Sequence, residues 1–194
     1  IVDNSVDEAI NGHASNITVT LSQDRSSVTV QDDGRGVPVD MHPTAKKPAL
    51  EVIFTTLHAG GKFDQGSYLT SGGLHGVGSS VVNALSESLT VEVLRGRKKY
   101  RQEFSRGKPT TKLKSLGKAR GTGTTVTFTP DPEIFSVTKF DPALIRTRLE
   151  TSTFLNKGLT ITFKDESQGT KEVFCHENGL TDYLTSLVKS SEIG

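Results

Sequence analysis

The chain has 194 residues, with 23 lysines and arginines against 22 aspartates and glutamates, so its formal net charge is +1 at pH 7. A single cysteine, Cys175, excludes a disulfide framework, and no apolar run approaches the roughly 20 residues that a membrane span needs. No signal peptide is visible and the chain does not begin with methionine. We therefore expect a soluble, cytoplasmic segment of a larger protein, with no membrane partner.

The hydrophobic pattern predicts strands in consecutive runs rather than in strict alternation with helices. Residues 1–11 place apolar side chains on one helical face, and residues 17–21 and 28–30 alternate as a β-hairpin. Further helices are expected at 49–57, 74–85, 144–155 and 180–188, and further strands at 89–94, 99–104, 124–128, 159–163 and 172–175. The pattern predicts an α+β fold, a two-layer sandwich in which a mostly antiparallel, mixed sheet carries helices on one face.

The charge is unevenly distributed along the chain. Residues 1–94 carry 5 basic and 11 acidic side chains, whereas residues 95–121 carry 11 basic side chains and only Glu103. A basic block of this kind is suited to a polyanion such as DNA. The alternative is a solvated, lysine-rich hairpin that protects the edge of the sheet.

The polar face of the first helix is a candidate metal site. Asn4, Asp7 and Glu8 have helical spacing and point the same way. The amide oxygen of Asn4 is a hard ligand of the kind that Mg²⁺ prefers. A solvated helix face is the alternative interpretation.

Two glycine-bearing segments follow or precede strands. Residues 32–38 (DDGRGVP) come after the 28–30 strand, so the Asp32 carboxylate can accept a hydrogen bond from an exocyclic amine while glycine lets a ligand approach. Residues 121–124 (GTGT) precede another strand, where Thr124 can place a hydroxyl beside a bound base. Ordinary turns are the alternative in both cases.

A third segment is typical of phosphate binding. Residues 60–78 are rich in glycine and open a helix, whose N-terminal N–H groups attract anions, and Lys62 adds a point charge. The G-x-x-G-x-G spacing is neither a dinucleotide fingerprint nor a Walker P-loop. A flexible loop is the alternative. The five histidines and the cysteine have no zinc spacing, and no nucleophile motif is present.

Taken together, the motifs resemble a known family. The runs DNSVDE at 3–8, DDGRGVP at 32–38, LHAGGKF at 57–63, SGGLHGVG at 71–78 and GTGT at 121–124 are similar to the ATPase domain of the type IIA DNA topoisomerases, in the branch of the bacterial gyrase B and topoisomerase IV B proteins. The wider group is the GHKL ATPases, so the resemblance implies the Bergerat ATP-binding fold. It implies an ATPase domain at 1–178 and the beginning of a transducer domain at 179–194.

The resemblance also implies a nucleotide site for ATP and Mg²⁺. Asn4 would be the Mg²⁺ ligand, Asp32 would accept from the adenine amino group, Gly36 would line the base, and Thr124 would support the contact through an ordered water. Lys62 and the 72–78 backbone would hold the phosphates, with 60–73 as a lid. Arg35, Pro38 and Arg101 would lie at the pocket mouth, where coumarin-type inhibitors bind. The full predicted set is Asn4, Glu8, Asp32, Arg35, Gly36, Pro38, Lys62, Gly72, Gly73, Leu74, His75, Gly76, Val77, Gly78, Arg101 and Thr124.

In the family, the glutamate that acts as general base stands immediately before the position of Ile1, so no catalytic residue is assigned within this sequence. We accordingly expect weak nucleotide binding, negligible hydrolysis and a monomeric fragment. In the intact enzyme the expected partners are a second copy of the subunit, the DNA-cleaving subunit in a heterotetramer, and DNA. The alternatives are another GHKL ATPase, of the chaperone or mismatch-repair type, and a nucleic-acid-binding module that uses residues 95–121.

Overall fold

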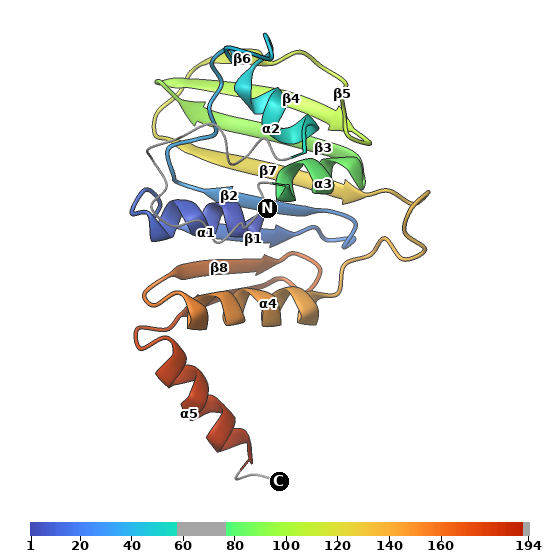
Figure 1. Cartoon of the computed structure of the whole chain (residues 1–194). Coiled ribbons are helices and arrows are strands. Elements are labelled where there is room, and N and C mark those ends of the chain that lie inside the picture. The colour runs from blue at the N-terminus through green and yellow to red at the C-terminus, as the bar shows by residue number, and fades with distance from the viewer. Residues whose placement is uncertain (58–76, 192–194) are drawn as a thin grey trace.

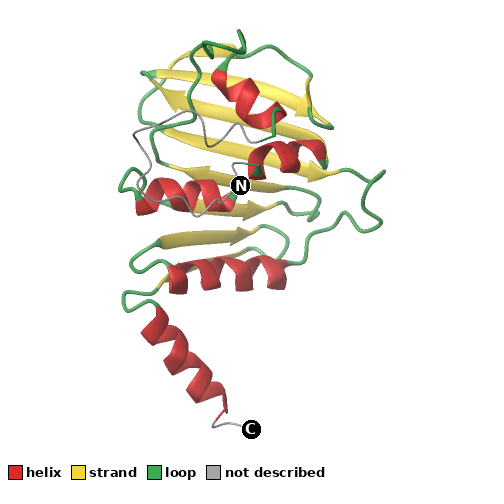
Figure 2. Cartoon of the chain, in the orientation of Figure 1, coloured by secondary structure: helices red, strands yellow, loops and turns green. Residues whose placement is uncertain are grey.

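A computed structural model describes residues 1–57 and 77–191 of the chain. Within these residues, nine strands form one sheet, and α1 to α4 lie against one of its faces (Figures 1 and 2). The other face of the sheet carries no helix in these views. The predicted α+β fold, with a mostly antiparallel mixed sheet covered on one side, is confirmed.

The helices and strands follow the predicted order closely. The helices are α1 (Val2–Ile10), α2 (Ala49–Thr55), α3 (Gly78–Ala84), α4 (Pro142–Leu155) and α5 (Leu180–Ser191). The strands are β1 (Ile17–Leu21), β2 (Val28–Asp32), β3 (Ser86–Arg95), β4 (Lys98–Ser105), β5 (Lys108–Pro109), β6 (Lys114–Lys118), β7 (Gly123–Pro130), β8 (Thr160–Asp165) and β9 (Thr170–Cys175).

The strand order brings together segments that are far apart in sequence. The order is β5-β4-β3-β7-β2-β1-β8-β9, and β6 also pairs with β4. Every pairing is antiparallel except β1 with β8. At the centre of the sheet, Asp32 at the end of β2 lies opposite Ile17 on one side and Thr124 on the other.

Two apolar clusters hold the helices against the sheet. The first joins β1, β2 and β8 to α1 and α4 through residues such as Leu21, Ile161 and Leu149. The second joins β3, β4 and β7 to α2, and includes Leu50 and Phe54. Because burial of a leucine or phenylalanine side chain contributes about 1.5–3 kcal/mol, these contacts fix the helices in place.

Three features differ from the prediction or extend it. Strand β2 continues to Asp32 because that residue pairs with neighbours on both sides, so Asp32 is its last residue and not the first of a loop. The basic segment contains two short strands, β5 and β6, which were not predicted. The first three residues of the helix expected at 74–85 lie outside the described residues, and α3 begins at Gly78.

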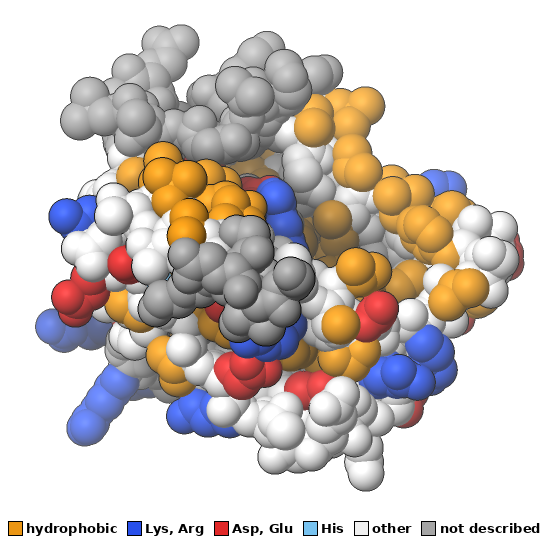
Figure 3. Space-filling view, turned by 90° about the horizontal axis from the view of Figure 1, so that it is seen from below, with side chains coloured by type: hydrophobic (Ala, Val, Ile, Leu, Met, Phe, Trp, Pro, Cys, Tyr) orange, Lys and Arg blue, Asp and Glu red, His pale blue; other side chains and the backbone are white. Residues whose placement is uncertain are grey.

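Helix α5 extends away from the sheet at the C-terminal end (Figure 1). Its apolar side chains, among them Leu180, Leu184 and Val188, are exposed. Figure 3, seen from below, shows hydrophobic side chains on this side of the molecule. None of the helices that the structure describes has the length and apolar character needed to cross a bilayer.

Candidate functional site

Asp32 is the centre of a buried polar network. The residue is 9% exposed, and its carboxylate accepts three hydrogen bonds: from Ser5 Oγ to Oδ2 (2.8 Å), and from Gly34 N (3.0 Å) and Thr124 N (3.2 Å) to Oδ1. The donors come from α1, the loop after β2, and β7, so the network joins three elements. The buried carboxylate is therefore held in one orientation.

Burial is the main influence on the acidity of this group. Desolvation raises the pKa of Asp32 above its usual range, and the negative charge of Glu8 raises it further. The hydrogen bonds from Ser5, Gly34 and Thr124 favour the charged form and oppose this shift. A polar acceptor kept in a desolvated position is typical of a ligand-binding site.

Two glycines let backbone segments pack closely around this site, Gly123 against Asp32 and Gly36 against Leu94. Gly36 has φ +78°, and a Cβ there would lie 2.7 Å from the carbonyl oxygen of Leu94. Gly123 has φ +144°, and its Cβ would overlap the carbonyl oxygen of Asp32 itself. A side chain is excluded at both positions by conformation and by space. The glycines predicted from sequence in DDGRG and GTGT are thus required by this geometry.

Thr124 and Pro38 lie in the same region. The Thr124 hydroxyl oxygen accepts a hydrogen bond from Val37 N (3.1 Å), which leaves its own hydrogen available to donate. Pro38 follows this contact and is half-buried. The structure therefore brings Thr124 to Asp32 as the sequence predicted, and ties the loop after β2 to β7.

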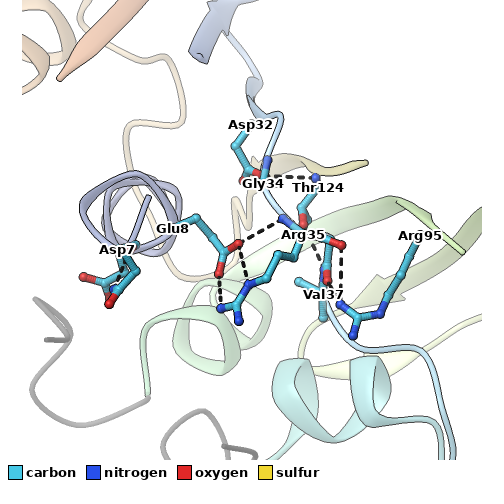
Figure 4. Close-up of polar contacts among 10 residues, drawn as sticks. Asp7, Glu8, Asp32, Gly34, Arg35, Val37, Arg95 and Thr124 are labelled. Atoms are coloured by element: carbon cyan, nitrogen blue, oxygen red, sulfur yellow. Dashed lines mark hydrogen bonds and ion pairs between the residues drawn. The ribbon is translucent and has the colours of Figure 1, made fainter. Parts of the chain in front are cut away.

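Glu8 and Arg35 form a second polar pair beside Asp32 (Figure 4). Arg35 Nη2 lies 2.8 Å from Glu8 Oε1, and both Arg35 Nε (3.3 Å) and its backbone N (3.0 Å) donate to Oε2. Such a two-pronged contact has more geometric specificity than a single ion pair. It fixes the loop after β2 to the polar face of α1.

Asn4 points toward α3. Its Nδ2 donates to Ser79 Oγ over 2.7 Å, and within the described residues its Oδ1 accepts no hydrogen bond. Val77 and Gly78 form the cap and first residue of that helix. The amide oxygen of Asn4 and the beginning of α3 therefore lie on neighbouring elements.

Arg101 lies apart from this group. It is opposite Glu92 in the β3–β4 register and contacts Glu92 (3.8 Å) and Glu103 (2.8 Å). Because side chains alternate between faces along a strand, Glu92 and Arg101 lie on the sheet face opposite Val93 and Thr124. The structure does not bring Arg101 together with Asp32, and its role at a pocket mouth stays a prediction.

Six predicted site residues lie outside the described residues: Lys62, Gly72, Gly73, Leu74, His75 and Gly76. Their predicted contacts with phosphate remain predictions. No group of three or more His, Cys, Asp or Glu side chains within the described ranges has the arrangement of a metal site.

Three contributors to the site were missed from sequence. Ser5 and Ser79 hold Asp32 and Asn4, and Arg95 Nη1 donates to the carbonyl oxygen of Gly36 (2.7 Å). Serine on a helix and arginine at a strand end are too common to signal a site. The only sequence signal nearby was the helical spacing of Asn4, Asp7 and Glu8, which does not single out Ser5.

Residues 1–134 match the family model described as histidine kinase-, DNA gyrase B- and HSP90-like ATPase. This range includes α1, β2, β7 and every described residue of the predicted site. The chain belongs to this ATPase family.

Within the family, the chain is similar to bacterial topoisomerase proteins. It is 53% identical to DNA gyrase B of Thermus thermophilus over 195 residues, which is 100% of this chain and 31% of that protein. It is 50% identical to DNA topoisomerase 4 B of Bacillus subtilis, covering 100% of this chain and 29% of that protein. The chain thus spans about a third of the length of these relatives.

A solved structure supports the same relationship. The crystal structure of the 43K ATPase domain of Thermus thermophilus gyrase B, in complex with an aminocoumarin, matches with a TM-score of 0.83 and 46% sequence identity. The match covers 96% of this chain and 47% of that one. It confirms the resemblance stated from the motifs and the fold that the resemblance implied.

Proposed function

We propose that the chain is the ATP-binding domain of a subunit of a bacterial-type DNA topoisomerase II. The observation that carries the proposal is the buried Asp32 carboxylate, held by Ser5, Gly34 and Thr124 where β2 and β7 approach each other closely at Gly123. Its Oδ2 would accept from the adenine amino group, with Gly36 against the base. Thr124 would add a polar contact through a water.

Mg²⁺ would be held by Asn4 together with the nucleotide phosphates. Mg²⁺ commonly takes one or two protein oxygens and completes its shell with phosphates and water. The Asn4 amide suits this mode because Ser79 binds its nitrogen and its oxygen accepts no hydrogen bond among the described residues. When bound, the ion would neutralise charge on the phosphates. Lys62 and the 72–78 backbone are proposed as the remaining phosphate contacts.

In the whole subunit, nucleotide binding would drive dimerisation of two such domains while DNA is passed. The partners would be a second copy of the subunit, the DNA-cleaving subunit and DNA, in the cytoplasm. The names of the relatives favour this over a chaperone or mismatch-repair ATPase. Because the similar gyrase B domain was solved with an aminocoumarin, we also propose that inhibitors of this class compete with ATP here.

Calorimetric titration with a non-hydrolysable ATP analogue, with and without Mg²⁺, tests the proposal. We expect one saturable site whose affinity rises with Mg²⁺. Asn4→Ala should abolish the Mg²⁺ dependence, whereas Asp3→Ala, one residue away and facing Arg148, should keep it. Absence of binding would contradict the function, and equal behaviour of the two variants would contradict the metal assignment.

A further inference from the structure

A cluster of five cations lies at one corner of the sheet, where the β3–β4 turn meets the end of β6. It comprises Arg95, Arg97, Lys98, Lys118 and Arg120, which we call the basic corner. Arg95 lies opposite Lys98, and Lys98 lies opposite Lys118, so three cations form one row across β3, β4 and β6. A backbone hydrogen bond from Ala119 N to Arg97 O (3.0 Å) holds the β3–β4 turn, and with it Arg97, beside the end of β6.

The row is unfavourable for the isolated domain. Side chains directly opposite on neighbouring strands share a face, and like charges in that position destabilise a sheet. Among the residues that the structure describes, Arg97, Lys98, Lys118 and Arg120 form no ion pair, and all four are exposed. Of the five side chains, Arg95 alone has a hydrogen-bond partner among the described residues, donating to the carbonyl oxygens of Gly36 (2.7 Å) and Arg35 (3.4 Å). The repulsion is therefore not relieved within the described part of the domain.

The turn itself adds to this cost. Arg97 has φ +59°, a left-handed conformation that a residue with a side chain seldom adopts. Asparagine or glycine is the usual choice at such a position in a two-residue hairpin turn. Arg97 therefore places a cation at the tip of the turn, next to unpaired lysines, in a conformation that asparagine or glycine adopts more readily.

Part of the remaining positive charge on the same strands is neutralised. Lys99 and Arg101 contact Glu92 on the other face of the same strands, and Arg106 contacts Asp131 and Glu133 at the opposite end of β4. Within the described residues Lys108, Lys112 and Lys114 also lack an ion pair, but the basic corner is where cations lie directly opposite one another on three neighbouring strands. It lies on an exposed sheet edge, so it presents an extended surface and not an enclosed site for a small anion.

We infer that the basic corner binds the phosphate backbone of duplex DNA, without reading its sequence. This rests on the proposed function, which supplies DNA as a partner. Three strands at about 4.8 Å spacing set the cations at intervals that long side chains can match to successive phosphates. Residues 95–99 and 114–121 contain no aromatic side chain, so the stacking contacts typical of single-strand binding are missing.

The test compares two matched double variants of the 194-residue protein. Lys98→Thr/Lys118→Thr removes an opposed pair from the basic corner. Lys164→Thr/Lys171→Thr removes an equally opposed pair on β8 and β9, in a segment with acidic neighbours. Binding of a fluorescent duplex of about 20 base pairs is followed by anisotropy between about 50 and 200 mM salt.

We expect the corner variant to lose about tenfold or more in affinity for the duplex at about 100 mM salt. The plot of log affinity against log salt concentration should also become shallower by about 1–2, because each phosphate contact contributes about 0.9 to that slope. The β8–β9 variant should stay within about twofold of wild type. Equal losses in both variants, or preference for single-stranded DNA, would overturn the inference. Titration of the same three proteins with the ATP analogue separates this result from the proposed function, because the corner variant should bind nucleotide normally.

Discussion

Substitution of Gly123 by alanine tests whether the close contact between β7 and Asp32 is required. The residue has φ +144°, and a Cβ would overlap the Asp32 carbonyl oxygen, which is backbone and cannot turn aside. Gly117 is the matched control, because it has φ +103° but a Cβ there meets nothing within 4 Å. Both substitutions carry the conformational cost of about 1–3 kcal/mol, and only Gly123→Ala adds the overlap.

We therefore expect Gly123→Ala to lower the free energy of unfolding by about 2 kcal/mol more than Gly117→Ala. For a domain of this size, that corresponds to a melting temperature lower by about 4–8 °C. Urea unfolding followed by circular dichroism measures the difference. Because Asp32 must shift, nucleotide affinity should fall only in Gly123→Ala. Equal destabilisation by the two alanines would refute the argument from close approach.

Three further predictions concern single contacts. Glu8→Gln should lower the free energy of unfolding in urea by about 1 kcal/mol, because it removes the charge that binds the part-exposed Arg35. An unchanged unfolding midpoint would show that the pair contributes nothing to stability. Asp141→Ala should lower the free energy of unfolding by about 1 kcal/mol in the same urea experiment, because Asp141 caps α4 by accepting a hydrogen bond from Ala143 N (2.8 Å). Asp141→Asn should retain most of this stability, because asparagine is also a favoured N-cap. Since burial raises the pKa of Asp32, the folded state binds the extra proton, and this group's contribution to stability falls as pH rises from its ordinary pKa through its raised pKa. Asp32→Asn should remove that part of the pH dependence of the melting temperature, and an unaltered profile would contradict the assigned shift.

Local patterns were sufficient to predict most of the fold. The alternation at 17–21 and the apolar spacing of 144–155 depend on neighbouring residues, so β1 and α4 could be predicted. The strand order and the parallel pairing of β1 with β8 depend on contacts between segments far apart in sequence, which no local pattern contains. Strand β6 was missed because all its residues are exposed and it has no hydrophobic alternation.

The candidate site was predictable where a motif demands unusual chemistry. In the run at 32–36, Gly34 packs against the Asp32 carboxylate and Gly36 against the Leu94 carbonyl, so both glycines that the motif singled out are needed for close approach. The position of Arg101 on the other face from Thr124 could not be predicted, because it depends on the strand register, and its role at a pocket mouth stays a prediction. Ser5 was also beyond prediction, since its role depends on how α1 is placed over β2.

The central claim is that Asp32 recognises the adenine of ATP, and one comparison of two carboxylates tests it. Asp33 is the matched control: it lies next in sequence but binds the backbone N of Ser15 and of Asn16, away from the buried network. Calorimetry with a non-hydrolysable ATP analogue should show a loss of about 10- to 100-fold for Asp32→Asn, the value of a charge-assisted hydrogen bond of about 1.5–3 kcal/mol. Asp33→Asn should bind as wild type. Equal affinities for the two variants would contradict the claim and separate the adenine site from Asp32.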